Sequence, residues 1–166
     1  MRRVEREISS KDEIKRLLDD SKIMRIAIND DLYPYILPLN FAATYSPDGN
    51  FRFYIHCAAE GRKISLIQKN NKVGFETDIH YGTINADSDI PCKMSTSYES
   101  VIGYGRLTIV RDEEEKRNGL ALIVKSLSTS NNLQQFSEAS FENVLVLRLD
   151  VLSVSAKKHV VPLAGA

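Results

Sequence analysis

The sequence contains no tryptophan, and its 166 residues include only two cysteines and three histidines. Cys57 and Cys92 lie far apart and lack the close spacing of a zinc or iron–sulfur site. The histidines, His56, His80 and His159, are equally scattered, so we expect no bound metal ion. Two unpaired thiols are usual in a reducing compartment, and we therefore expect a cytoplasmic protein.

The chain also lacks a net charge, because 22 Lys and Arg residues balance 22 Asp and Glu residues. No overall field draws it to nucleic acid or to anionic lipid, and we expect neither as a partner. No apolar run approaches the roughly 20 residues that a membrane-spanning helix needs, so we expect no membrane segment. No apolar stretch of the kind found in a signal peptide follows the charged residues 1–7.

What remains is an ordinary globular composition, 43% hydrophobic and 27% charged. By the usual length prior, a chain of this size forms one domain, and it buries about two-thirds of its unfolded surface. No internal repeat or linker interrupts the sequence. We therefore assign residues 1–166 to a single domain, and we expect a loose tail from about residue 157.

Alternation of apolar and polar residues predicts six or so strands. They are expected over residues 22–29, 33–44, 51–57, 72–78, 101–110 and 144–155. Residues 80–91 are polar and have little periodicity, which predicts a loop. Gly103 and Gly105 within one strand indicate a bulge or a sharp bend, as a small closed barrel requires. The pattern favours a mainly β protein, an antiparallel barrel with peripheral helices.

Three segments have helical signals. Ser10 followed by Glu13 is typical of a capping box and predicts a helix start, and Asp112 is a plausible cap for a second helix. A third, shorter helix is expected after Gly61, with Ile64 and Ile67 on one face.

The most informative stretch joins the strand at residues 51–57 to the helix after Gly61. Arg62 and Lys63 open that helix, where the partial positive charge of the N-terminus makes basic residues mildly unfavourable without an anion. A phosphate would accept hydrogen bonds from the free N–H groups, the Arg62 guanidinium and the Lys63 ammonium. The stretch therefore predicts a phosphate-binding turn. The alternative is a solvated Arg–Lys pair on a surface turn.

Three motifs follow one another in order: Pro38 to Phe41, His56 to Lys63, and Ser100 to Gly105. With them the chain resembles the pyridoxamine 5′-phosphate oxidase-related flavin-binding split barrels, and within these the 5-nitroimidazole-resistance proteins. The resemblance covers about residues 1–158. It implies a six-stranded antiparallel split β-barrel and a homodimer. It also implies FMN at the dimer interface, with FAD as the second option.

The resemblance also implies a set of site residues. Arg62 and Lys63 would hold the FMN phosphate, and His56 would stand at the flavin as the catalytic residue. The alternative for His56 is an inter-strand histidine that is hydrogen-bonded to the backbone. The full set of implied cofactor-binding residues is Pro38, Leu39, Asn40, His56, Gly61, Arg62, Lys63, Tyr98, Ser100, Val101 and Ile102.

The implied function is an FMN-dependent oxidoreductase. It would pass electrons from a reduced nicotinamide or flavin to a small aromatic or nitro compound such as a 5-nitroimidazole. Residues 160–166 lack the Arg-Leu-x-Pro type segment that helps true pyridoxamine phosphate oxidases to hold substrate, so we do not expect that activity. The segment before Ser100 lacks the Trp and Arg often found in the nitroimidazole subgroup, so we expect a different substrate face.

Three other functions remain open from the sequence. A non-catalytic flavin- or haem-binding module would use His56 or His159 as an iron ligand. A deazaflavin-dependent reductase on the same barrel ranks lower, because the run from Gly61 to Lys63 matches FMN-binding proteins better. A purely structural role ranks last, since it does not explain the unpaired Arg62 and Lys63.

Overall fold

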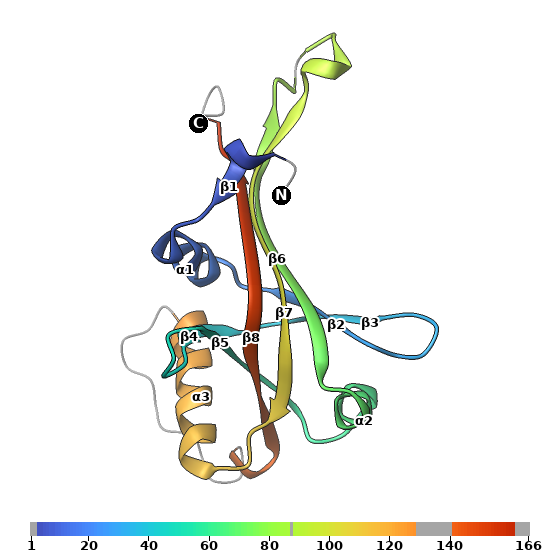
Figure 1. Cartoon of the computed structure of the whole chain (residues 1–166), viewed down its shortest axis with the longest axis vertical. Coiled ribbons are helices and arrows are strands. Elements are labelled where there is room, and N and C mark those ends of the chain that lie inside the picture. The colour runs from blue at the N-terminus through green and yellow to red at the C-terminus, as the bar shows by residue number, and fades with distance from the viewer. Residues whose placement is uncertain (1–2, 87, 129–140, 162–166) are drawn as a thin grey trace.

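The computed structural model describes residues 3–86, 88–128 and 141–161. In these residues eight strands form one antiparallel sheet, with three α-helices against it (Figure 1). The strands are β1 (Glu7–Ile8), β2 (Met24–Ile28), β3 (Tyr35–Leu39), β4 (Ala42–Tyr45), β5 (Phe51–Ala58), β6 (Lys72–Ile84), β7 (Ser95–Ile109) and β8 (Val144–His159). The helices are α1 (Lys11–Asp20), α2 (Arg62–Lys69) and α3 (Glu113–Leu127), with 3-10 turns η1 (Val4–Arg6) and η2 (Pro91–Lys93).

The sheet has the strand order β3-β2-β6-β7-β8-β5-β4, and β1 pairs with β8. It stays open between β3 and β4. The three long strands β6, β7 and β8 form its spine, and the β6–β7 hairpin extends well beyond the body of the molecule (Figure 1). The prediction of a mainly β, antiparallel split barrel with peripheral helices is confirmed.

One core fills the concave side of the sheet. It combines inward-facing residues of β2, β5, β7 and β8 with the apolar faces of α1 and α2. The Phe53 ring lies edge-on to the rings of Phe41 and Phe75, with centroid distances of 5.6 and 5.2 Å. A second, smaller cluster lies under α3, where Leu120 and Ile123 pack with Tyr54 of β5. α3 thus covers the outer side of β5 and of the first residues of β8, whereas no helix of the described residues covers the outer side of β6 and β7.

The three helices begin where the sequence predicts. The Ser10 hydroxyl accepts a hydrogen bond from the Glu13 amide (3.3 Å), and the Asp112 carboxylate accepts one from the Glu115 amide (2.8 Å). Gly61 is the N-cap of α2 and has a φ of 124°, in the region that L side chains rarely adopt.

The strand expected over residues 33–44 is wrong as one element. It divides into β3 and β4, which lie at opposite edges of the sheet. Phe41 and Ala42 are both buried although they are adjacent, and one regular strand cannot turn two successive side chains to the same side. This division, together with the short β1, gives eight strands instead of the expected six.

Two further boundaries differ. β6 continues to Ile84 through the expected loop at residues 80–91, and β8 continues to His159 into the expected loose tail. Both extensions form their backbone pairing with β7. Many of their side chains are exposed, so these segments lack the alternation of apolar and polar residues that predicts a strand. Residues 162–166 of the expected tail lie outside the described residues. The bulge expected near Gly103 and Gly105 is confirmed between Tyr104 and Gly105.

Candidate functional site

The turn between β5 and α2 leaves open space at a helix N-terminus. Gly61 offers no side chain to cap α2, and a Cβ added there would meet no atom within 4 Å. Since the first amides of a helix lack intrahelical partners, these groups remain available to an outside acceptor. The geometry of the turn therefore fits an anion, as the sequence predicts.

Arg62 connects this turn to the sheet edge. Its guanidinium forms an ion pair with Asp30 and lies over the Tyr35 ring, 5.1 Å from the ring centroid. The Arg62 side chain is still 67% exposed, and a guanidinium has five N–H donors, so the pair with Asp30 leaves donors free. Asp30 lies in the turn between β2 and β3 and Tyr35 opens β3, and no local sequence pattern predicts either contact.

Lys63 follows Arg62 in the same turn and is partly buried. It has no ion pair with any residue that the structure describes. Burial raises the pKa of the neighbouring Cys57 thiol, and the positive charge of Lys63 opposes this shift. The turn thus presents a lysine ammonium whose charge no described side chain neutralises.

The outward face of the sheet carries a second group of predicted site residues. Pro38 of β3 pairs with Arg25 of β2, Arg25 with Glu76 of β6, and Glu76 with Ile102 of β7. Residues that are directly opposite share one face, so this row runs across four strands on the solvent side. At about 4.8 Å per strand, Pro38 and Ile102 lie roughly 14 Å apart. We call the solvent side of β2, β3, β6, β7 and β8 the outward face.

A charged cluster lies in the middle of the outward face. Arg25 donates to Glu76 (3.0 Å) and to Asp78 (2.7 Å). Burial raises the pKa of Glu76 and the neighbouring Asp78 adds to the shift, while Arg25 opposes it. Arg25 was missed as a site residue; its only signal was its place on the polar side of an alternating strand.

The predicted residues of β7 fall on two sides of the sheet. Val101 is fully buried in the core, so only its main chain can meet a ligand. Ser100 and Ile102 point to the outward face. Ile102 is half exposed, whereas the Ser100 hydroxyl is buried without a hydrogen-bond partner among the described residues.

Tyr98 lies further along β7 among cations. Lys157 lies over its ring at 5.2 Å from the centroid, and the Arg6 side chain also approaches its phenol closely enough to affect the pKa. Burial alone would raise the pKa of this phenol, but the two cations outweigh it and lower the pKa below its ordinary value.

Three other predicted residues have different surroundings. His56 is exposed on the side of β5 opposite to Phe53 and Ile55, and it pairs with Val146 of β8. Asn40 donates its side-chain amide to the carbonyl of Lys22 (2.9 Å), so this group anchors the crossing between β3 and β4. Leu39 is partly buried against the core. The structure therefore does not gather all the predicted residues around one point of a single chain.

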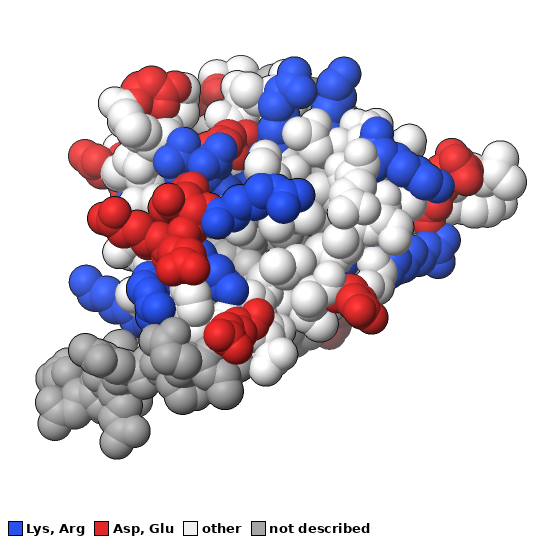
Figure 2. Space-filling model, turned by 90° about the horizontal axis from the view of Figure 1, so that it is seen from below, with Lys and Arg blue, Asp and Glu red and all other residues white. Residues whose placement is uncertain are grey.

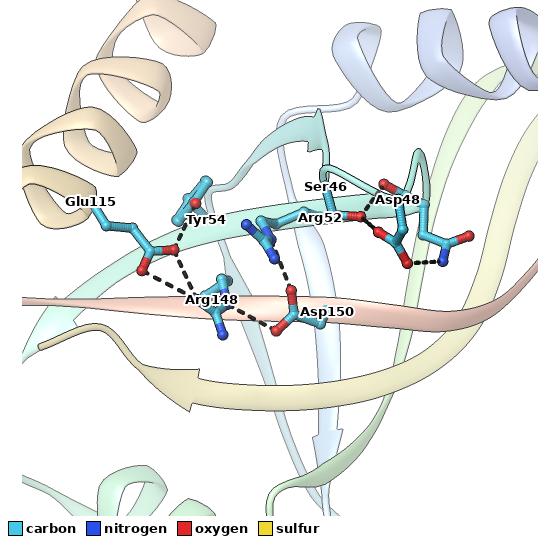
Figure 3. A network of polar contacts seen from close by, with 8 residues as sticks. Ser46, Asp48, Arg52, Tyr54, Glu115, Arg148 and Asp150 are labelled. Carbon is cyan, nitrogen blue, oxygen red and sulfur yellow. Dashed lines mark hydrogen bonds and ion pairs between the residues drawn. The ribbon is translucent and has the colours of Figure 1, made fainter. Parts of the chain in front are cut away.

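A separate polar network lies between α3, β5 and β8 (Figure 3). Arg148 donates to Glu115 (3.0 and 3.1 Å) and to Asp150 (2.8 Å). Arg52 donates to Asp150 (2.8 Å), and the Tyr54 hydroxyl donates to Glu115 (2.9 Å). Every charged group of this α3 network has an opposite charge as its partner. Seen from below, acidic and basic side chains lie next to each other beside a broad uncharged surface, so this end has no extended field of one sign (Figure 2).

A cavity of about 770 Å³ lies between η1, α1 and the upper parts of β6, β7 and β8. At its buried floor, Glu99 accepts hydrogen bonds from Arg16 (2.6 Å) and from the Tyr81 hydroxyl (2.6 Å). Burial would raise the pKa of Glu99, but these two partners outweigh it and lower the pKa. His159 lines the same cavity, with Nδ1 at 3.0 Å from the Thr96 carbonyl oxygen.

No group of three or more His, Cys, Asp or Glu side chains within the described part of the chain could hold a metal ion. In the same residues no helix combines the length and the apolar character needed to span a membrane.

A comparison with protein families matches residues 10–158 to the family model described as pyridoxamine 5′-phosphate oxidase. The chain belongs to this family. The match spans the turn at Gly61 and all eleven predicted site residues. A search of curated protein sequences found no significant match.

Solved structures agree with this membership. A candidate 5-nitroimidazole antibiotic resistance protein from Bacteroides thetaiotaomicron is 26% identical, with a TM-score of 0.75 over 91% of this chain and 85% of that one. The flavocytochrome Anf3 from Azotobacter vinelandii is 20% identical, with a TM-score of 0.78 over 98% and 73%. An FAD- and haem-binding protein from Mycobacterium smegmatis is 18% identical, with a TM-score of 0.79 over 97% and 77%. The last two support the fold alone, and the resemblance to the flavin-binding family and to its nitroimidazole-resistance members is confirmed.

Proposed function

We propose that this member of the family binds FMN and reduces a small aromatic or nitro compound such as a 5-nitroimidazole. The observation that carries the proposal is the uncapped turn at Gly61 with Arg62 and Lys63 beside it. Two cations, free helix amides and open space make a suitable binding site for a phosphate monoester. We call this site, formed by Gly61, Arg62 and Lys63, the phosphate seat. Asp30 cancels part of this charge and orients the Arg62 guanidinium, so the seat is already arranged before the phosphate arrives.

The flavin would supply the electron transfer, taking electrons from a reduced nicotinamide or flavin. The chain's own residues bind and orient. Arg62 and Lys63 hold the phosphate. Tyr35 and Pro38 are three residues apart on β3, or about 10 Å at 3.3 Å per residue. Tyr35 faces the core and Pro38 the outward face, so a cofactor with its phosphate beside Tyr35 would cross the open edge of β3 to bring its ring to Pro38. The free main-chain groups of this edge strand would then serve the polar rim of the ring.

We also propose that the site is completed by a second copy of the chain. Ser100 and Ile102 lie on β7, three strands away from the edge strand β3. One flavin would therefore not contact both these residues and Pro38 of β3 within one chain. The outward face exposes several large apolar side chains, which favours burial against another protein. They are Ile36, Ile102, Tyr104 and Leu152. In a homodimer built on this face, Ser100 and Ile102 of one chain would lie on the flavin of the other.

His56 is the proposed proton donor to the reduced substrate. It is exposed and five residues before Gly61, and no described residue hydrogen-bonds to it, so its ring is free to meet a ligand.

The test begins with the visible absorption spectrum of the purified chain and of the chain incubated with FMN and then desalted. We expect the two bands of an oxidised flavin, release of FMN on denaturation, and a dimer in solution. Anaerobic addition of NADH and a 5-nitroimidazole should then consume the nitro compound. A colourless protein that does not retain added FMN would rule out the phosphate seat, and a flavoprotein that reduces no nitroaromatic would rule out the activity.

One observation favours a second candidate, a haem-binding module. A carbonyl oxygen only accepts hydrogen bonds, so His159 Nδ1 carries the proton and Nε2 is left to ligate a metal in the neutral ring. The adjoining cavity has a volume of about 770 Å³, and Arg6 on its wall suits a carboxylate of a haem, whereas Arg16 and Lys158 already pair with carboxylates of the chain. Addition of hemin should then give a sharp Soret band that the His159→Ala variant loses and the His56→Ala variant keeps. Most residues that line the cavity are charged, which is why we rank this function second.

A further inference from the structure

A smaller cavity opens on the outward face between β1, β7 and β8. Its volume is about 260 Å³. Its lining residues are Glu7, Ser100, Ile102, Ser155, Ala156 and Lys157. It is separate from the phosphate-binding turn, and the sequence predicted a role there only for Ser100 and Ile102.

The Ser100 hydroxyl makes this cavity unusual. Ser100 is only 7% exposed, and its hydroxyl is the one buried side-chain polar atom without a hydrogen-bond partner in the described residues. Buried hydroxyls nearly always have a partner, because an unpaired one loses its bond to water without replacement. The missing partner is therefore expected to come from outside this chain.

Lys157 supplies a second donor at the same cavity. Its ammonium lies near the Tyr98 ring, and it forms no ion pair within the described ranges. Its neighbour Lys158 points to the other face of β8 and is paired with Glu13. Of these two adjacent lysines, only Lys157 has an ammonium available to a ligand on the outward face.

The charges around the cavity balance. Glu7 lies opposite Lys157 in the pairing of β1 with β8, so the wall carries one negative and one positive charge. Asp78 lies opposite Ser100 and is engaged by Arg25, while Arg6 approaches Tyr98 at the cavity's edge. Because Glu7 would repel an anion, the Ser100 hydroxyl and the Lys157 ammonium favour an uncharged oxygen acceptor at this cavity.

We propose that this cavity receives the oxygens of an uncharged aromatic substrate, a nitro or carbonyl group, with the Ser100 hydroxyl and the Lys157 ammonium as donors. The inference rests on the proposed function, because it assigns the recognition of the substrate to the face that would carry the flavin. Half-exposed Ile102 would contact the aromatic ring. Tyr98 is a positioning residue, because it holds the Lys157 side chain beside the cavity.

The test is calorimetric titration of the FMN-loaded, oxidised protein without an electron donor, so that binding is measured and no turnover occurs. The probes are 2-methyl-5-nitroimidazole, 2-methylimidazole, which lacks the acceptor, and imidazole-4-carboxylate, whose acceptor is charged. We expect the nitro compound to bind most tightly. Ser100→Ala and Lys157→Met should each weaken its binding about tenfold, the usual size of a lost hydrogen bond to a charged or buried group.

Lys158→Met is the matched control, since it removes the same charge one residue away on the opposite face. It should leave nitroimidazole binding unchanged. Ser100→Ala should also keep or raise the melting temperature of the ligand-free protein, because it removes an unpaired buried hydroxyl. A binding role predicts both effects together, whereas a purely structural role predicts a lower melting temperature with unchanged binding.

Three results would overturn the inference. One is equal affinity for the nitro compound and 2-methylimidazole, and another is unchanged nitro binding in both variants. The third is a loss of the dimer in Ser100→Ala, which would make a second chain the partner of the hydroxyl. Measuring the FMN affinity of each variant distinguishes a failure of this inference from a failure of the proposed function. Variants that lose flavin and nitroimidazole together place Ser100 and Lys157 on the cofactor, while a parent protein that binds no FMN overturns the proposed function itself.

Discussion

The α3 network and the outward face use the same kinds of side chain in opposite ways. In the α3 network, Glu115 and Asp150 each accept from two donors, so the charges neutralise one another within the chain. Around the outward face and its adjoining turn, Lys63 and Lys157 have no described counter-ion, and Ser100 has no described partner.

The difference separates stabilising groups from binding groups. A charge that is satisfied inside the chain contributes to folding and is not available to a ligand. A donor that the fold leaves unsatisfied lowers stability slightly and is free to bind an acceptor from outside. Substitutions in the two regions should therefore change different measured quantities, namely the free energy of unfolding in one and the affinity for ligands in the other.

The largest expected effect is on flavin affinity at the turn. Arg62→Ala combined with Lys63→Ala should weaken FMN binding by about 3–6 kcal/mol, because each charge-assisted hydrogen bond contributes roughly 1.5–3 kcal/mol. Quenching of flavin fluorescence measures this change. The urea midpoint should hardly move, since the pair of Arg62 with Asp30 is largely exposed.

Lys69→Ala is the control for this double variant, because it removes a cation from the other end of α2. It should leave FMN affinity as it is. Unchanged FMN affinity in the double variant would mean that the unpaired groups of the turn are not binding groups, and the distinction from the α3 network would be lost.

The second effect is on stability in the α3 network. Arg148→Ala should lower the free energy of unfolding by about 2–3 kcal/mol, because it removes the donors to both Glu115 and Asp150. The Arg148 side chain is only 27% exposed, so water replaces these bonds incompletely. Urea denaturation measures the loss, and FMN affinity should not change.

Lys15→Ala is the matched control for Arg148→Ala. Lys15 also pairs with a carboxylate, that of Asp19, but this partner lies one turn away on α1 and is 52% exposed, whereas Glu115 and Asp150 are 24% and 32% exposed. Such pairs contribute roughly 0.3–0.5 kcal/mol. An equal loss in the two variants would mean that the α3 network contributes no more than an ordinary surface pair.

A third effect depends on pH. The pKa of Glu99 is lowered in the folded chain, so its carboxylate contributes stability above its ordinary pKa of 4.5, and the contribution is lost as the pH falls through the folded pKa. Glu99→Gln should therefore lower the free energy of unfolding at pH 7 by about 1–2 kcal/mol. Thermal unfolding from pH 7 to pH 3 should show the difference from the parent protein shrinking below pH 4.5. Exposed Glu5 lines the same cavity, and Glu5→Gln should leave the parent's pH profile unchanged.

The sequence predicted the elements whose signals are local. The caps at Ser10 and Asp112 and the glycine at position 61 act within one turn of the chain, and all three lie at helix starts in the structure. The division between β3 and β4 was missed, because it depends on Phe41 and Ala42 both entering the core. The outer halves of β6 and β8 were missed because their order comes from backbone pairing, which leaves no hydrophobic period in the sequence.

The features of the candidate site also divide into those with a local sequence signal and those that depend on long-range contacts. Arg62 and Lys63 were predicted from their own positions at a helix start. The contacts of Arg62 with Asp30 and of Tyr98 with Lys157 join residues that are 32 and 59 positions apart. No local pattern encodes such contacts, so they became visible only in the fold. His56 stays a prediction, because its exposed position on β5 fits a catalytic role and a surface role equally.

The smallest effect tests whether Asp30 weakens phosphate binding at the turn. Asp30 is the one described carboxylate that pairs with Arg62, and it competes with a bound phosphate for the same guanidinium. Asp30→Asn removes that competing charge while it keeps the shape and an acceptor oxygen. We therefore expect FMN to bind about threefold more tightly, which corresponds to less than about 1 kcal/mol, the range of exposed ion pairs. The gain should shrink as salt is added, because exposed charges are screened beyond roughly 10 Å at 0.1 M salt. Weaker FMN binding in Asp30→Asn would mean instead that Asp30 serves mainly to orient Arg62, and the turn would then resemble the internally paired α3 network more than an open seat.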